Sequence, residues 1–326
     1  MTSKASAKSK PASRSNAKAR REAARTPPPG WKDPLAQQQP LVSGAWLARA
    51  LLAVIGCAAV FAYLTLCLLF YQGQWQVVFH PSRTITTTPA SVGLKYDDVR
   101  FDYTGTGTSQ LNGWWIPAGA NVPQPTATIL FLHDSHGSLS DTVDQLKTLH
   151  SIGVNVFAFD YRGFGNSAND HPSEQNVYSD ADAAWTYLTD IRHLDSKSIV
   201  LYGTGLGATV ASETAVRHRE SPALILENPA PPALGLIEAD ARTHLLPIKW
   251  LFRDRFEIEP KLDQLGVELR QPIRDLVKSG KPSPEPVIIR QETAPDKGPR
   301  LLIFLGPNPQ TDPRYLPTLA EFLPRN

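Results

Sequence analysis

The sequence contains little cysteine, which limits the chemistry open to it. Only two of its 326 residues are cysteines, Cys57 and Cys67, and both lie in one apolar run. Residues 76–326, which read as the folded part, therefore have no disulfide, no thiol nucleophile and no thiolate metal site.

Net charge is also low, at +2, but it is unevenly distributed. Residues 1–45 carry nine Lys and Arg against Glu22 and Asp33, which leaves 24 basic and 29 acidic residues in the remainder. Because the basic excess belongs to a tail and no basic stripe with interleaved aromatics follows, no nucleic-acid partner is expected. The tail lacks apolar periodicity and is predicted to be disordered, either solvated or drawn to anionic lipid headgroups.

Charge is nearly absent from residues 46–71, where Arg49 is the only charged residue. At about 1.5 Å per residue this stretch exceeds a hydrocarbon core of about 30 Å, so it predicts a single transmembrane helix and a bilayer partner. A cleavable signal peptide is the main alternative, but the run is too long and begins too late. The basic excess before it predicts a cytosolic N-terminus and an extracytoplasmic C-terminal domain, periplasmic if the source is bacterial.

Residues 76–326 alternate between short apolar runs and helical stretches, which predicts one α/β domain with a doubly wound, mostly parallel sheet. An antiparallel pair is expected at 99–103 and 111–117. Continuous apolar runs then predict buried parallel strands at 127–133, 154–160, 198–202 and 223–227. Helices are expected at 140–150, 174–191, 206–219 and 315–323, and late strands at 286–290 and 300–305. Residues 230–285 have no clear strand and are a possible lid or an irregular region.

The main motif follows the strand at 198–202, where Gly203, Thr204, Gly205, Leu206 and Gly207 lead into a helix. This is the layout of the nucleophile elbow G-x-S-x-G, whose outer glycines let strand and helix approach closely. Together with FHPSR at 79–83, GWWIPA at 113–118, ILFLHD at 129–134 and FAFDYRGFGNS at 157–167, it resembles the α/β-hydrolase superfamily, in particular its membrane-anchored esterase-like and acyl-hydrolase-like members. The resemblance implies the α/β-hydrolase fold and makes lipid-like acyl groups the natural substrate class.

The sequence departs from that family at all three triad positions. Gly205 stands where such enzymes hold serine, and glycine adopts the expected positive φ of the elbow without strain. The family's base is a His after the last strand, but the last histidine in this chain is His244. No G-x-x-D-type turn supplies the orienting Asp, for which Asp275 and Asp296 are weak substitutes. Without a base a serine hydroxyl is a poor nucleophile, so the sequence predicts loss of the Ser-His-Asp mechanism.

The oxyanion corner is altered too. Relatives commonly place a His-Gly pair after the strand at 127–133, whereas this chain has His133, Asp134, Ser135 and His136 before Gly137. A carboxylate at Asp134 would oppose a negative transition state.

Two other interpretations compete with loss of catalysis. Gly203, Gly205 and Ala208 fit the dinucleotide fingerprint G-x-G-x-x-G/A, with Glu227 as the ribose-binding acid, although this copy lies several strands into the fold. Alternatively, a metal is bound by polar side chains at adjacent strand ends, namely His133, Asp134, His136 and Asp160, or Ser135 and His136 form a relocated catalytic pair. The simpler interpretation is that they are polar residues at a loop mouth, with Asp160 and Arg162 fixing the turn geometry.

The sequence thus predicts a membrane-anchored, catalytically degenerate α/β-hydrolase-type protein that binds an acyl or small hydrophobic ligand, or a protein partner. An active esterase, thioesterase or amidase with relocated catalytic residues is the first alternative, and nucleotide binding is the second. No cofactor and no metal are expected. The candidate residues lining its site are His133, Asp134, Ser135, His136, Asp160, Tyr161, Gly205 and Leu206.

Overall fold

The computed structural model describes residues 30–32, 42–107, 110–119, 122, 125–238, 243, 245–267, 269–279, 283–291 and 298–324. The predicted disordered tail at residues 1–45 lies largely outside these ranges. The chain divides into two units, Met1–Leu64 and Thr65–Asn326. Each unit is described by itself.

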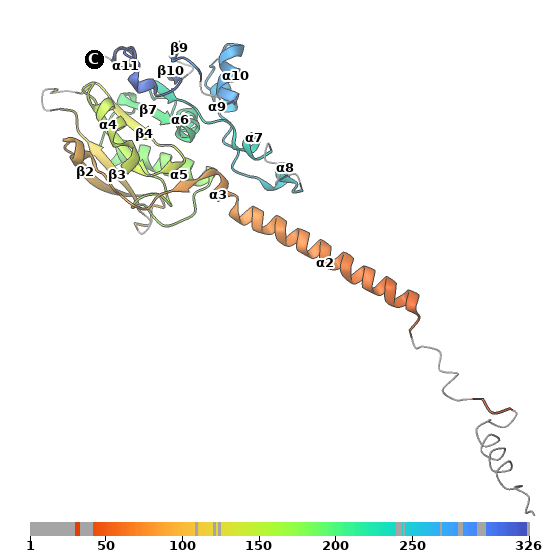
Figure 1. Ribbon diagram of the computed structural model, residues 1–326. Coiled ribbons are helices and arrows are strands. Elements are labelled where there is room, and N and C mark those ends of the chain that lie inside the picture. The colour runs from red at the N-terminus through yellow and green to blue at the C-terminus, as the bar shows by residue number, and fades with distance from the viewer. Residues whose placement is uncertain are drawn as a thin grey trace, which may run out of the picture. The chain divides into compact units, whose positions relative to one another are not determined.

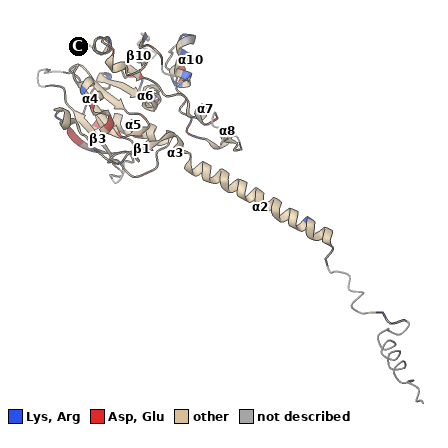
Figure 2. Ribbon diagram, in the orientation of Figure 1, with Lys and Arg blue, Asp and Glu red and all other residues tan. Residues whose placement is uncertain are grey.

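One long helix, α2 (Gly44–Gly73), contains the whole apolar run at residues 46–71. Within the described residues it is the one helix long and apolar enough to cross a membrane, with a mean hydropathy of 2.5. Figure 2 shows it almost without charge. Composition therefore makes α2 a candidate membrane span.

The second unit is built on an eight-stranded sheet with the order β2-β3-β6-β4-β7-β8-β10-β9 (Figure 1). Its strands are β2 (Asp97–Asp102), β3 (Gln110–Ile116), β4 (Thr128–Leu132), β6 (Asn155–Asp160), β7 (Ile199–Thr204), β8 (Ala223–Glu227), β9 (Val287–Gln291) and β10 (Arg300–Leu305). Strands β6, β4, β7, β8 and β10 are parallel to their neighbours in that series. The predicted doubly wound, mostly parallel sheet is confirmed.

The opening pair β2 and β3 is antiparallel, as expected, with Val99 opposite Gly113. The central strands are buried along their whole length or nearly so, because helices cover both faces of the sheet. This is why continuous apolar runs, without alternation, marked them in the sequence. The late strand β9 pairs antiparallel with β10, a direction that the sequence pattern did not predict.

Side chains alternate between two hydrophobic cores, one on each face of the sheet. Leu130 and Leu201 point to the face covered by α5 (Glu174–Thr186) and α6 (Leu206–Arg217). Ile129 and Val200 point to the face covered by α4 (Val143–His150) and α11 (Tyr315–Phe322). The predicted helices at 140–150, 174–191, 206–219 and 315–323 thus form the two outer layers. Two of them have irregular ends: η2 (Leu139–Thr142) precedes α4, and a π-helical turn, η3 (Tyr187–Ile191), follows α5.

Between β8 and β9 the described residues form four short helices in place of a strand. They are α7 (Ala233–Glu238), α8 (Ile248–Leu251), α9 (Glu259–Gln264) and α10 (Gln271–Ser279). The remaining short elements are α3 (Trp75–Val78), β1 (His80–Pro81), η1 (Pro89–Val92), β5 (His136–Gly137), η4 (Ser196–Ser198) and η6 (Pro309–Thr311). Strands β1 and β5 form a separate two-stranded parallel ribbon.

Candidate functional site

Gly205 lies at the turn between β7 and α6 with φ 58° and ψ −123°. The expected positive φ of the elbow is therefore confirmed, and few residues other than glycine adopt this region without strain. The turn is held on both sides by the last residue of β8 and by the chain after it. The Gly205 amide donates to the Glu227 carbonyl at 3.0 Å, and the Ala230 amide donates to the Gly205 carbonyl at 3.0 Å.

The outer glycines of the motif allow close backbone approach. A Cβ atom at Gly203 would overlap the Gly207 carbonyl, and one at Gly207 would overlap the Leu132 carbonyl of β4. The elbow architecture is thus intact, and only its central side chain is missing.

The Asp134 carboxylate occupies the space that a central side chain would need. A Cβ atom at Gly205 would overlap all three atoms of that carboxylate group. Its Oδ1 accepts hydrogen bonds from the Leu206 amide at 2.8 Å and from the Ser135 amide at 2.7 Å. In a nucleophile elbow, the amide after the nucleophile is one of the oxyanion donors. An internal anion therefore fills the donor pair at the mouth of the elbow.

Asp134 also interacts with His136, whose Nδ1 lies 3.9 Å from Asp134 Oδ2. Burial would raise the pKa of Asp134, but His136 and the Leu206 and Ser135 amides outweigh it and hold the pKa below its usual value. The same contact with Asp134 raises the pKa of His136. Asp134 is therefore ionised at neutral pH. Since both side chains reach solvent, this ion pair itself contributes little to stability.

A cavity of about 310 Å³ opens beside this turn. Apolar side chains make up most of its wall and polar ones gather at one side. Its lining residues are Val77, Val78, His80, Asp134, Ser135, His136, Leu206, Ala230, Pro231, Ala233, Ile237 and Phe256. Of the candidates named from the sequence, Asp134, Ser135, His136 and Leu206 line it, and Gly205 lies directly behind Asp134. The other eight lining residues were not predicted.

His80 is the most informative of the unpredicted residues, because it belongs to the FHPSR motif. Its ring stacks on that of His136, with centroids 4.8 Å apart and planes 6° from parallel. The β1–β5 ribbon holds it there, with the His80 amide donating to the Ser135 carbonyl at 2.9 Å. The motif was visible in the sequence, but its pairing with residues 136–137 depends on tertiary structure.

Ser135 and His136 form a hydrogen-bonded pair in this cavity, with Ser135 Oγ 3.0 Å from His136 Nδ1. Asp134 approaches the same nitrogen. In a Ser-His-Asp triad the acid and the serine bind opposite ring nitrogens. The three consecutive residues therefore hold the right functional groups in a different arrangement.

His133, Asp160 and Tyr161 do not line the cavity, in contrast to the sequence-based expectation. The His133 ring packs against Tyr161, at 4.4 Å between centroids, and against Phe164, at 5.1 Å. Its Nε2 lies 3.8 Å from Asp160 Oδ1, and both residues are buried. Burial lowers the pKa of His133 to about 4 and raises that of Asp160 to about 7. Strand-end position alone could not tell that these side chains turn into the core.

Asp160 and Arg162 of the DYRGFG motif fix local geometry. Asp160 Oδ1 accepts a hydrogen bond from the Leu139 amide at 2.9 Å. The Arg162 guanidinium pairs with the buried Asp180 carboxylate of α5, with Nε donating to Oδ1 at 2.8 Å. This motif therefore connects the end of β6 and the turn after it to η2 and to α5.

The geometry opposes a nucleotide site at the glycine turn. Such a site needs free amides at the start of α6, but the Leu206 amide is bound to Asp134. Glu227, the expected ribose ligand, is buried and hydrogen-bonded to Tyr202, and Gln145 Nε2 donates to its Oε2 at 3.0 Å. Its carboxylate thus belongs to the core between β7, β8 and α4.

Within the described residues, the late strands do not bring the missing triad members to Gly205. The orienting Asp would follow the strand before the last one, which is β9. Because β9 is antiparallel, its final residue Gln291 pairs with Leu301 near the start of β10. This is the amino-terminal end of the parallel strands, whereas Gly205 lies at their carboxyl-terminal end. Of the weak substitutes, Asp275 lies on α10 and Asp296 lies outside the described residues. After β10 the chain continues through Gly306 and Asn308, and residues 298–324 contain no histidine.

The proposed metal cluster is not assembled either. In the part of the chain that the structure describes, no three His, Cys, Asp or Glu side chains are grouped to hold a metal ion.

Comparison with known proteins agrees with the fold. Residues 123–252 match the family described as serine aminopeptidase, S33. The α/β-hydrolase domain-containing protein WAV2 of Arabidopsis thaliana is 32% identical over 152 residues, which are 45% of this chain and 47% of the relative. The chain belongs to the α/β-hydrolase superfamily.

Two further matches are a curated relative and a solved structure. The α/β-hydrolase domain-containing protein 17C of Homo sapiens is 35% identical over 122 residues, which are 37% of this chain and 36% of the relative. An esterase structure from Pyrococcus furiosus is 20% identical, with a TM-score of 0.49, and covers 75% of this chain and 96% of its own. This α/β-hydrolase chain spans about half the length, or less, of the curated relatives it matches.

Proposed function

We propose that this chain is a membrane-anchored α/β-hydrolase-superfamily protein that has lost the Ser-His-Asp mechanism and acts by binding a ligand. The observation that carries the proposal is the Asp134 carboxylate, which fills the place of the nucleophile side chain above Gly205 and uses the amides of Leu206 and Ser135. Oxyanion donors accelerate acyl transfer only if they are free to receive charge that develops in the transition state. Because the ionised Asp134 carboxylate occupies both amides, the site repels the negative charge of that transition state.

The wall of the cavity suits a small amphiphile. Eight of its twelve lining residues are apolar or small, while His80, Asp134, Ser135 and His136 provide hydrogen-bonding groups at one side. An apolar cavity with a few convergent polar groups is the usual form of a small-molecule site. The favoured ligand is a molecule with an acyl or other apolar body and a polar head that donates hydrogen bonds to Asp134.

Anchoring through α2 is part of the proposal. Its length and composition suit a membrane span, and Tyr71 and Trp75 suit the interface at its C-terminal end. The basic residues before it favour a cytosolic N-terminus and an extracytoplasmic hydrolase-type domain.

Ligand binding can be tested by photocrosslinking the full chain in lipid nanodiscs with a diazirine-bearing fatty alcohol. Crosslinks mapped by mass spectrometry should fall on cavity residues such as Phe256 and Ile237. Ala233→Trp, which fills the cavity, should abolish them. Ala90→Trp adds the same ring at an exposed position and should not. Equal labelling of the two variants, or labelling confined to α2, would contradict binding in this cavity.

A second function, hydrolysis through Ser135 and His136, is favoured by one observation. Their Oγ and Nδ1 atoms are 3.0 Å apart in the cavity, within reach for proton transfer. The Ser135 amide, however, is bound to Asp134, and Ser135 itself is nearly inaccessible. Labelling of Ser135 by a serine-reactive probe separates this function from the first.

A further inference from the structure

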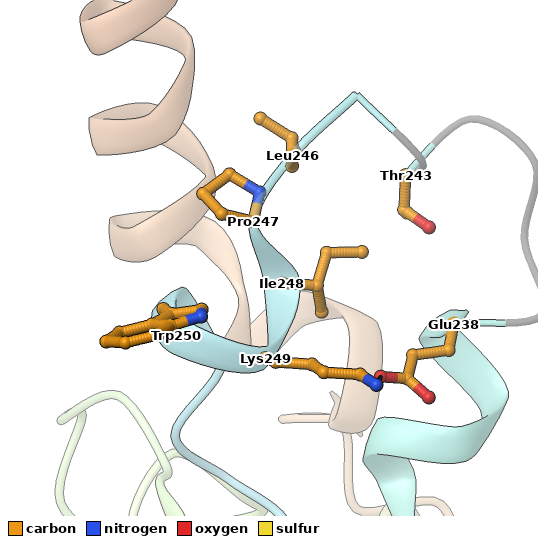
Figure 3. Close-up of a pocket in the computed structure, with 7 residues that line it drawn as sticks. All are labelled: Glu238, Thr243, Leu246, Pro247, Ile248, Lys249 and Trp250. Carbon is orange, nitrogen blue, oxygen red and sulfur yellow. Dashed lines mark ion pairs between the residues drawn. The ribbon is translucent and has the colours of Figure 1, made fainter.

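Apart from the ligand cavity, the domain has an exposed apolar surface on the segment at residues 245–250. Trp250 is 90% exposed and Leu245 is 79% exposed, more than any other large hydrophobic side chain in the described residues. Isolated exposed hydrophobic residues are common in proteins, but these two are extreme and share one short segment. Figure 3 shows the Trp250 ring extending from α8 on the side away from Thr243 and Glu238.

A cavity of about 310 Å³ adjoins this segment and is lined by residues 246–250 of the segment together with Thr243 and Glu238, the last residue of α7. Pro247, Ile248 and Trp250 line it, and Lys249 lies 3.8 Å from Glu238 at its edge (Figure 3). The surface is therefore apolar with a charged border. Such a composition suits the boundary between lipid headgroups and acyl chains.

The residues after this segment are fixed to the C-terminal end of α2. The Gln74 side chain accepts a hydrogen bond from the Arg253 amide at 2.8 Å and donates to the Leu251 carbonyl at 3.4 Å. The Arg253 guanidinium lies over the Tyr71 ring, 4.4 Å from its centroid. Gln74 is buried by these contacts. Trp250 is only three residues from Arg253, so chain geometry keeps it within about 10 Å of that anchor point.

We infer that residues 245–250 insert into the same bilayer leaflet as the C-terminal end of α2 and hold the domain against the membrane. This inference rests on the proposed membrane span. If α2 crosses the bilayer, Tyr71 lies at its interface, and the contacts of Arg253 and Gln74 bring residues 245–250 to the same level. Trp and Lys are typical of that interface. Lipid is the occupant because Leu251 and Arg253, which directly follow the exposed segment, contact Tyr71 and Gln74 at the end of the apolar helix.

Contact of residues 245–250 with the bilayer would give the ligand cavity beside Gly205 a route to its ligand. Val77 and Val78 line that cavity a few residues after α2 ends, and Ile237 lines it next to Glu238 of the segment's own cavity. Holding residues 245–250 in the leaflet therefore keeps the ligand cavity close to the bilayer surface. An amphiphile could then pass from lipid to protein over a short distance.

The test uses the full chain in nanodiscs, with Cys57 and Cys67 replaced by alanine. A single cysteine introduced as Trp250→Cys carries an environment-sensitive fluorophore, and Ile191→Cys is the matched control. Ile191 is also an exposed hydrophobic residue, but it ends η3. The other end of that helical run, Glu174, is bound to Asp254, so Ile191 lies about 25 Å from this region.

Lipids brominated near the headgroup should quench the probe at position 250 at least about two-fold more than the probe at 191, because a group inserted about 5–10 Å lies within reach of the bromines. Equal quenching at the two positions, or none at 250, would overturn the inference while leaving the span intact. A protein partner covering the segment in place of lipid would also give no quenching. Release of the chain from nanodiscs by alkaline carbonate would overturn the anchoring, and this inference with it.

Discussion

Replacing Gly205 with alanine should destabilise the domain far more than an ordinary glycine substitution. Two costs combine at this position. The backbone conformation, with φ 58° and ψ −123°, is one that costs a residue with a side chain about 1–3 kcal/mol. The new Cβ would also overlap the Asp134 carboxylate, which must then move away.

The second cost follows from the hydrogen bonds that Asp134 would lose. It accepts from the Leu206 and Ser135 amides, and a hydrogen bond to a charged group contributes about 1.5–3 kcal/mol. Partial exposure of Asp134 puts these bonds near the lower value, because water replaces them. Gly205→Ala should therefore lower the free energy of unfolding by about 4–6 kcal/mol.

A double-mutant cycle separates the two costs. With Asp134→Ala already present, Gly205→Ala should cost only the backbone strain, so the coupling between the two positions is about 3 kcal/mol. Gly93→Ala is the matched control. Gly93 also has a positive φ, 82°, but a Cβ there meets nothing within 4 Å, so it should cost about 1–2 kcal/mol.

Unfolding can be followed by near-ultraviolet circular dichroism of the full chain in mild detergent, since Trp114 and Trp115 are buried in the domain. Additive effects of Gly205→Ala and Asp134→Ala, within about 0.5 kcal/mol, would refute the overlap between the two sites.

The remaining predictions concern buried charges and the elbow. Stability due to neutral His133 is lost as pH falls from 6.5 toward 4, and stability due to protonated Asp160 is lost as pH rises from 3.8 toward 7. As pH rises from 4 to 6.5, the free energy of unfolding of His133→Gln should therefore fall by about 3 kcal/mol relative to wild type. As pH rises from 4 to 7, that of Asp160→Asn should rise by a similar amount relative to wild type. The same dependence of unfolding free energy on pH in the variants and the wild type would contradict this. Asp180→Asn should cost about 3–5 kcal/mol by leaving the buried Arg162 guanidinium unpaired, and a loss below about 1 kcal/mol would contradict that pairing. Gly205→Ser alone should give no ester turnover above wild type, because Asp134 fills the space and occupies the amides that a serine mechanism needs.

The sequence predicted the fold well because its signals were local. The buried runs at 127–133, 154–160 and 198–202 became β4, β6 and β7, since strands covered on both faces need apolar residues at every position. The positive φ at Gly205 followed from one motif. These features depend on periodicity and turn chemistry, which a single sequence carries.

What the sequence could not give depends on side-chain direction and strand pairing. Asp134 was expected to oppose an oxyanion, but its position on the amides of Leu206 and Ser135 needed the geometry of the turn. His133 follows the same strand as Asp134, β4, but its side chain turns into the core. The reversed direction of β9 is set by its pairing with β10, which the apolar composition of Val287–Gln291 does not encode. His80 reaches the cavity only through pairing with His136.

The most direct test of the central claim is reaction of the full chain in nanodiscs with a fluorophosphonate probe, beside an ester assay, followed by mass-spectrometric identification of any modified serine. Absence of specific labelling and turnover from folded protein is the predicted result, because the elbow carries Gly205 and its amides bind Asp134. Labelling of Ser135 with ester turnover, both lost in Ser135→Ala, would contradict the account and establish the Ser135/His136 pair as a working catalytic site.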